Sequence, residues 1–174
     1  ADRVGLVNEL VEGWPDEAEE SAEPLYKLAH ENGLAMLALQ AGRNAEVRER
    51  GERAPAENSS PTLPLALAFS RVMVALSLLH EGDAYRVDAF LRPLLRDAER
   101  DTGRRGMLPC VYAPVLAAAM REQGDAAGAL ALLADRLDVI ERSGAPDMVL
   151  LAYRTLADAA MDLTLDYHGV DHRA

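Results

Sequence analysis

Four residues with side chains suited to ligand binding recur along this sequence at a spacing of 41 positions: His30, Arg71, Tyr112 and Tyr153. Arg71 is the only charged residue between positions 62 and 79. A guanidinium group binds carboxylates and phosphates through several N–H groups at once. The spacing predicts that the four side chains form a row along one groove, with Arg71 binding an anionic or hydroxyl-bearing ligand.

The same four residues also have a purely structural interpretation. Tyrosines often pack between neighbouring elements and keep their hydroxyl groups at the rim. An arginine in an apolar helix can pair with an acidic residue on the next helix while its stem stays buried. This packing role is the more common one for such residues, and the sequence leaves both interpretations open.

Two histidines near the end of the chain have a spacing that zinc sites use. His168 and His172 are four residues apart, as two metal ligands on one helical turn would be. However, Gly169 lies between them, and no cysteine or third histidine is near. We expect a solvated C-terminus here and no metal.

Catalytic signatures are sparse in the rest of the sequence. Cys110 lies in the apolar stretch MLPCVYAPV with no histidine close by, so we expect a buried hydrophobic side chain and not a nucleophile. An enzyme built on helices would need carboxylates or histidines on inward faces, and residues 62–81 and 106–121 offer almost none. We therefore expect a protein that is not an enzyme, with no cofactor.

The elements that position these residues are marked by three glycines, Gly42, Gly82 and Gly124, which are 40 and 42 residues apart. A glycine can adopt the left-handed conformation that ends a helix, and an aspartate after it can cap the next helix. Asp83 and Asp125 hold that place in the second and third turns. A small residue stands seven positions before each glycine, which allows two helices to approach closely: Ala35, Ala75 and Ala117.

These periodicities predict antiparallel helix pairs with a repeat of about 40–42 residues. Hydrophobic residues make up 49% of the chain and aromatic residues only 5%, which favours helices over strands. We expect one all-α domain over residues 1–174, with an internal loop at 54–62 and helices kinked or restarted at Pro93 and Pro114. The expected helices are 23–41, 44–53, 64–81, 84–102, 106–123, 126–143 and 146–167.

The turn glycine, the small residue before it, and Ala129 five positions after Gly124 resemble tetratricopeptide repeats, although that family repeats at about 34 residues. The longer pairs, and above all the unit EQGDAAGALALLADRLDVIERSG, resemble the superhelical sensor region of large LuxR-type bacterial regulators with a MalT-like architecture. The resemblance covers residues 23–174. It implies a tetratricopeptide-like, right-handed superhelix of helix hairpins.

The resemblance also implies a function in transcription regulation. In such regulators the repeat region senses a small-molecule inducer or a regulatory protein and controls an ATP-dependent switch. The nucleotide-binding module and the DNA-binding helix-turn-helix would be elsewhere in a longer protein, because this sequence has no phosphate-binding G-x-x-x-x-G-K-[ST] motif and a single lysine, Lys27. The alternative is a general scaffold for protein–protein interaction that is unrelated to transcription.

Charge and composition limit the kinds of binding partner that we expect for this chain. The formal net charge of −11 opposes direct contact with a phosphate backbone. The apolar run 63–79 is shorter than the roughly 20 residues of a membrane span and contains Arg71, so we expect a core helix and no membrane contact. A single cysteine fits the cytoplasm. We expect the chain to be a segment of a longer array that self-associates through a terminal helix.

Overall fold

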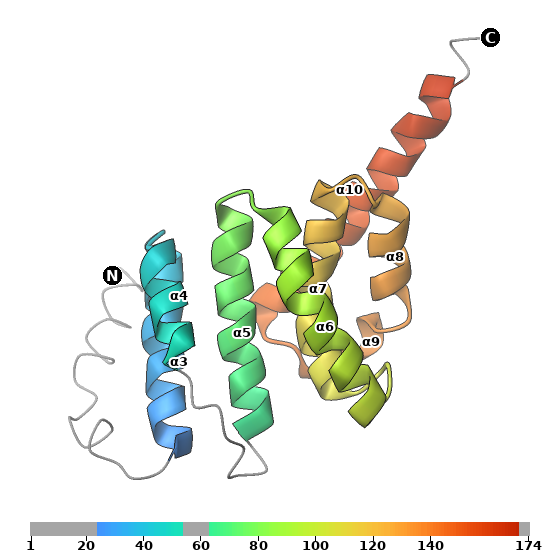
Figure 1. Ribbon diagram of the computed structural model, residues 1–174. Helices are drawn as coiled ribbons and strands as arrows, with labels where there is room; N and C mark the ends of the chain where they lie inside the picture. The colour runs from blue at the N-terminus through green and yellow to red at the C-terminus, as the bar shows by residue number, and fades with distance from the viewer. Residues whose placement is uncertain (1–23, 54–62, 171–174) are drawn as a thin grey trace, which may run out of the picture. The chain divides into compact units, whose positions relative to one another are not determined.

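The computed structural model describes residues 24–53 and 63–170, and every regular element in that part of the chain is an α-helix. The all-α prediction is therefore confirmed. The expected loop at 54–62 lies outside the described residues. The helices are α3 (Pro24–Gln40), α4 (Asn44–Glu52), α5 (Leu63–His80), α6 (Ala84–Thr102), α7 (Met107–Glu122), α8 (Ala126–Ala134), α9 (Leu137–Ser143) and α10 (Pro146–Val170) (Figure 1).

The chain divides into two compact units, one that ends at Glu81 and one that begins at Gly82. In the first unit α3, α4 and α5 each pack against the other two. Leu28 on α3 and Leu67 on α5 form an apolar cluster. The Asn32 side chain donates a hydrogen bond of 2.9 Å to the Ala66 carbonyl and so fixes α3 against α5.

Helix α4 lies close to α5 because the α4 residue at the point of contact is a glycine, Gly51. Val47 of α4 is fully buried. A Cβ atom at Gly51 would lie only 2.3 Å from Cγ2 of Val74, which is closer than two carbon atoms can approach. The glycine therefore allows a close approach of two helices that a larger residue would push apart.

The predicted glycine turns have the geometry that ends a helix. Gly42 and Gly124 adopt φ angles of 71° and 88°, and the N–H of the next residue reaches back to the carbonyl five positions earlier. This is the Schellman arrangement, which satisfies carbonyls left free at a helix end. The capping prediction is also confirmed, since Asp83 accepts a hydrogen bond from the Arg86 amide and Asp125 accepts one from the Gly128 amide.

Helix α7 is the centre of the second unit. Every residue from Pro109 to Met120 is buried, and α6, α8, α9 and α10 all pack against this helix. A helix surrounded in this way is apolar around its whole circumference. Of the two predicted effects of proline, a restart does not occur, because α6 continues through Pro93 and α7 continues through Pro114; a kink at either place stays a prediction.

The predicted helix 126–143 is wrong in one respect, because the structure has two helices there. Helix α8 ends at Ala134 and α9 begins at Leu137. Between them, the side chain of Arg136 is completely buried. Local helix propensity favours one continuous helix over residues 126–143. The contacts of the Arg136 guanidinium group with distant residues interrupt that helix.

None of the helices in residues 24–53 and 63–170 combines the length and the apolar character that crossing a bilayer requires. The apolar run at 63–79 forms most of α5, which packs against α3 and α4. Its buried residues include Leu67, Val72, Leu76 and Leu78. The prediction of a core helix at this place is confirmed.

Candidate functional site

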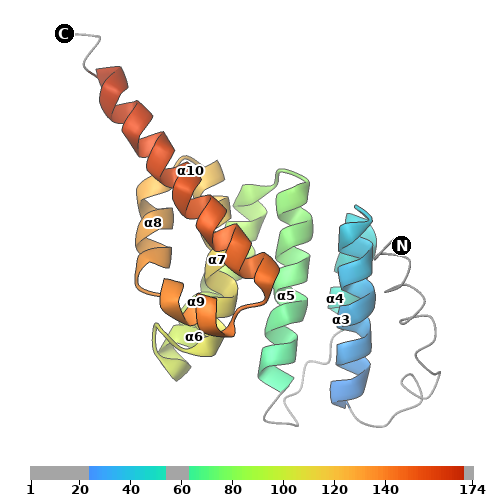
Figure 2. The ribbon, with the colours of Figure 1, turned by 180° about the vertical axis from the view of Figure 1, so that it is seen from behind.

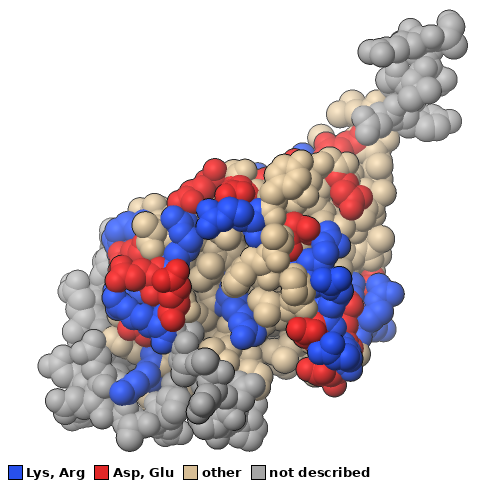
Figure 3. Space-filling model, viewed as in Figure 1, with Lys and Arg blue, Asp and Glu red and all other residues tan. Residues whose placement is uncertain are grey.

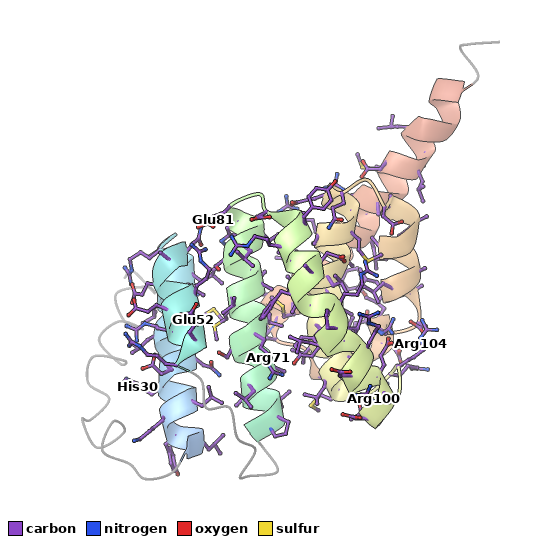
Figure 4. All side chains as sticks on the ribbon, in the orientation of Figure 1. His30, Glu52, Arg71, Glu81, Arg100 and Arg104 are labelled. Atoms are coloured by element: carbon purple, nitrogen blue, oxygen red, sulfur yellow. The ribbon has the colours of Figure 1, made fainter. Side chains whose placement is uncertain are left out.

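The four residues predicted to share a groove lie on α3, α5, α7 and α10, one on each. His30 and Arg71 belong to the first unit, and Tyr112 and Tyr153 belong to the second. In Figure 4, His30 lies on the side of α3 away from α5. Two residues correspond to a rotation of about 200° around a helix, so His30 lies nearly opposite the buried Leu28. Arg71 is exposed on α5. The row of four stays a prediction.

The two tyrosines differ in their surroundings. Tyr112 is buried within α7 and is only 3% exposed, so it contributes little surface to a ligand. Tyr153 is exposed, and its hydroxyl group donates a hydrogen bond to the carboxylate of Glu141 on α9. This hydrogen bond raises the pKa of Tyr153 above its usual value. Tyr153 therefore connects α9 to α10 and lies at the surface of the second unit.

Sequence reasoning did not identify Arg136, the largest fully buried side chain of the chain's described part. Its Nε donates to the Arg104 carbonyl at 3.0 Å, and its Nη1 donates to the Leu132 carbonyl at 2.5 Å. Its Nη2 pairs with the carboxylate of Glu99 on α6. The guanidinium group thus joins α6, the α6–α7 turn and α8, and its role is structural.

Cys110 lies in this part of the second unit and is buried, as predicted. Burial raises the pKa of its thiol, and the positive charge of Arg136 offsets this only in part. A thiol with a raised pKa carries little of the reactive thiolate at neutral pH. Among the described residues, no group of three or more His, Cys, Asp or Glu side chains could hold a metal ion. The pair His168 and His172 lies outside the described side chains.

A row of arginines runs along the outer side of α6 at intervals of four residues: Arg92, Arg96 and Arg100. Aspartates accompany them, since Arg92 pairs with Asp88 and Arg100 pairs with Asp97. In the space-filling view, blue and red side chains lie next to each other over this region (Figure 3). The row is therefore a solvated ridge of ion pairs more than a positive patch for phosphate groups.

Arg121 fixes α10 to α7. Its Nε lies 2.8 Å from Asp162 and its Nη1 lies 3.2 Å from Asp158, both on α10. The hydrogen bond with Asp162 is the main reason that the pKa of Arg121 is raised. Two carboxylates one helical turn apart thus hold one guanidinium group, and this sets which side of α10 faces outward.

The outward side of α10 carries large apolar side chains, with the exposed Arg154 and Thr164 among them. Leu150, Met161 and Leu165 are 69%, 61% and 66% exposed. Residues three, four or seven positions apart lie on the same side of a helix, so these three share one side with Tyr153 and Ala157. We call this surface the α10 face; its residues are Leu150, Tyr153, Ala157, Ala160, Met161 and Leu165. The C-terminal half of α10 extends beyond the ends of α7 and α8 (Figures 1 and 2).

The equivalent side of α7 is covered. The 41-residue repeat relates five residues of the α10 face to residues of α7, and all five α7 residues are buried. They are, in order, Pro109, Tyr112, Leu116, Ala119 and Met120. In α7 this side packs within the surrounding helices of the unit, whereas in α10 the same side is open to solvent in the described part of the chain. The α10 face therefore resembles a helix-packing surface that no helix among residues 24–53 and 63–170 covers.

The described residues define an all-α protein with an exposed, largely apolar side on its last helix. Comparison with models of known protein families, with curated proteins and with solved structures found no match in any of the three.

Proposed function

We propose that this chain is a helical-repeat interaction domain that acts as the sensor segment of a LuxR-type, MalT-like, ATP-dependent transcriptional regulator in the cytoplasm. In this proposal the hairpins stack as a tetratricopeptide-like, right-handed superhelix. The domain takes up an inducer or a regulatory protein, and DNA is bound by another domain of the regulator. The resemblance of the glycine turns and of residues 122–144 to such sensor regions supports the assignment.

One observation supports the proposed interaction function most directly. Five residues of the α10 face are open to solvent or half-exposed, although their repeat counterparts on α7 are all buried. Exposed apolar surface of this extent is unfavourable in water unless a partner covers it. A repeat array is completed by its neighbours, so a surface of this kind accepts a helix from a partner.

The distribution of charge supports a protein or small-molecule partner more than nucleic acid. The chain has 29 acidic and 18 basic residues, and two of the three arginines on the outer side of α6, Arg92 and Arg100, pair with aspartates. Binding to a phosphate backbone needs a surplus of positive charge on one surface. We therefore assign DNA contact to a different domain.

The regulator assignment is tested by reading the gene on both sides of the codons for residues 1–174. The proposal expects a P-loop nucleotide-binding module upstream and a helix-turn-helix downstream in the same reading frame. A reading frame that encodes neither the nucleotide-binding module nor the helix-turn-helix would contradict the regulator assignment. It would favour the alternative, a general scaffold for protein–protein interaction.

The interaction function is tested with a reporter gene placed behind the promoter that the complete protein controls. Leu150→Glu and Met161→Glu place charges on the α10 face, and we expect each to change the reporter response at least fivefold, about 1 kcal/mol of lost contact. Tyr85→Glu is the matched control, because Tyr85 is 75% exposed on α6. Equal responses from all three variants would contradict an interaction at the α10 face.

A further inference from the structure

We infer that the α10 face binds the α10 face of a second copy of this chain, with the two helices antiparallel and Ala157 of each copy at the two-fold axis. This inference rests on the proposed interaction function and names the partner. It follows from the order of residues along α10, from the charges beside the α10 face and from the way Arg121 holds the helix.

The order of residue sizes along the α10 face is nearly the same in both directions. Leu150 and Leu165 lie at its two ends, Tyr153 and Met161 lie inside them, and Ala157 lies at the centre. In an antiparallel pair centred on Ala157, each leucine meets the leucine of the other copy and each tyrosine meets a methionine. Small residues at the centre allow the two helix axes to approach closely while large residues fill the space on either side.

The charges beside the α10 face also favour the antiparallel arrangement. Arg154 and Asp158 lie one turn apart along the same edge of the face, and Arg154 is 77% exposed. A two-fold axis at Ala157 places Arg154 of each copy near Asp158 of the other copy. In a parallel pair each edge of one helix faces the opposite edge of the other, so Arg154 and Asp158 would not meet across the contact.

The orientation of the α10 face is fixed within the chain. Arg121 bridges α7 to Asp158 and Asp162, so the rotation of α10 about its own axis is fixed before a partner binds. From Leu150 to Leu165 the face is about 22 Å long at 1.5 Å per residue. One pair of helices of this length buries less than a standard stable interface, so the dimer is reversible.

The first test is sedimentation equilibrium of the 174-residue chain at concentrations from about 5 to 500 µM, the range that a small interface requires. We expect a monomer–dimer equilibrium. Ala157→Glu and Leu165→Glu, both at exposed positions, weaken it at least tenfold, whereas Tyr85→Glu on α6 leaves it unchanged. Circular dichroism confirms that each variant keeps its helices.

The second test determines direction by disulfide cross-linking under mild oxidation. An antiparallel pair brings position 157 of both copies together, so Ala157→Cys forms a covalent dimer. Leu150→Cys is the matched control and stays monomeric alone, because the two 150 positions lie about 20 Å apart along the axis. A mixture of Leu150→Cys and Leu165→Cys cross-links. The native Cys110 is buried and does not interfere.

Three outcomes would overturn the inference. The first is a wild-type chain that stays monomeric over the whole range. The second is a dimer that cross-links at Leu150→Cys alone, because that pair would be parallel. The third is a monomer whose Ala157→Cys thiol is protected from iodoacetamide, because another segment of the same chain would then cover the α10 face. A monomer would leave the reporter test of the interaction function standing, and equal reporter responses would refute that function even for a dimer.

Discussion

Arg136 decides the local path of the chain in the second unit. Its side chain has no exposed surface, and it meets two backbone carbonyls and the carboxylate of Glu99. Burying a guanidinium group is unfavourable unless its N–H groups are satisfied. Here Leu132 and Asp135 are local partners, but the Arg104 carbonyl and the Glu99 carboxylate come from 32 and 37 residues away in sequence. The interruption between α8 and α9 is the local consequence of these contacts.

Replacing Arg136 with alanine should lower the free energy of unfolding by about 3–5 kcal/mol, because the change leaves the Glu99 carboxylate without its partner and opens a cavity. Arg136→Lys keeps the charge but not the planar fork of donors, so it should remain clearly destabilising. Urea unfolding followed by circular dichroism measures both.

Arg96→Ala is the control for this experiment, since Arg96 is exposed on α6 and its loss should change stability by less than about 0.5 kcal/mol. A change of under 1 kcal/mol for Arg136→Ala would refute the structural role given to the buried arginine.

Glu46 gives the first unit a dependence on pH. Hydrogen bonds from Arg43 and then from Arg50 hold the pKa of this carboxyl group below its usual value. Because the pKa is lower in the folded state, the stabilisation is present above the usual pKa of about 4.3 and is lost as the pH falls through the lowered value.

Glu46→Gln should therefore reduce stability at pH 7 by a few tenths to about 1 kcal/mol, since the side chain is partly exposed to solvent. The difference from the wild-type protein should vanish in strong acid. Glu52→Gln in the same helix is the control. Thermal unfolding from pH 2 to 7 measures the difference, and a Glu46→Gln effect that does not depend on pH would contradict this account.

At the scale of elements, the turns determine where helices begin. Asp125 and Arg43 occupy the same place after a turn glycine, with ψ angles of 62° and 63°, but only the aspartate caps its helix with a side-chain hydrogen bond. Asp125→Ala should cost about 1 kcal/mol, whereas Arg43→Ala should lose only an exposed ion pair and cost less. Urea unfolding compares the two, and equal losses would refute the capping role.

The sequence was sufficient for most of the elements because their signals are local. Gly42 and Gly124, with the residues just before them, predicted two helix turns that the structure has. The interruption at Asp135 and Arg136 could not be predicted in this way, because it depends on Glu99. A charged pair within the apolar stretch LLADRLDVI was the available signal.

At the scale of the whole molecule, the sequence predicted less of the candidate site than of the fold. The 41-residue spacing placed Tyr112 and Tyr153 at equivalent points of two helices, but spacing does not reveal that one is buried and the other exposed. That difference depends on which helices surround α7 and α10. The repeat therefore became informative about function only when burial at equivalent positions was compared.

The central claim is that the α10 face binds a second copy of this chain, and amide hydrogen exchange at rising protein concentration tests it most directly. A helix that extends beyond its neighbours exchanges quickly unless a partner covers it. We predict that peptides from residues 150–165 become protected at least tenfold between about 5 and 500 µM, while peptides from α6 do not change. Exchange in residues 150–165 that is the same at every concentration would contradict the account.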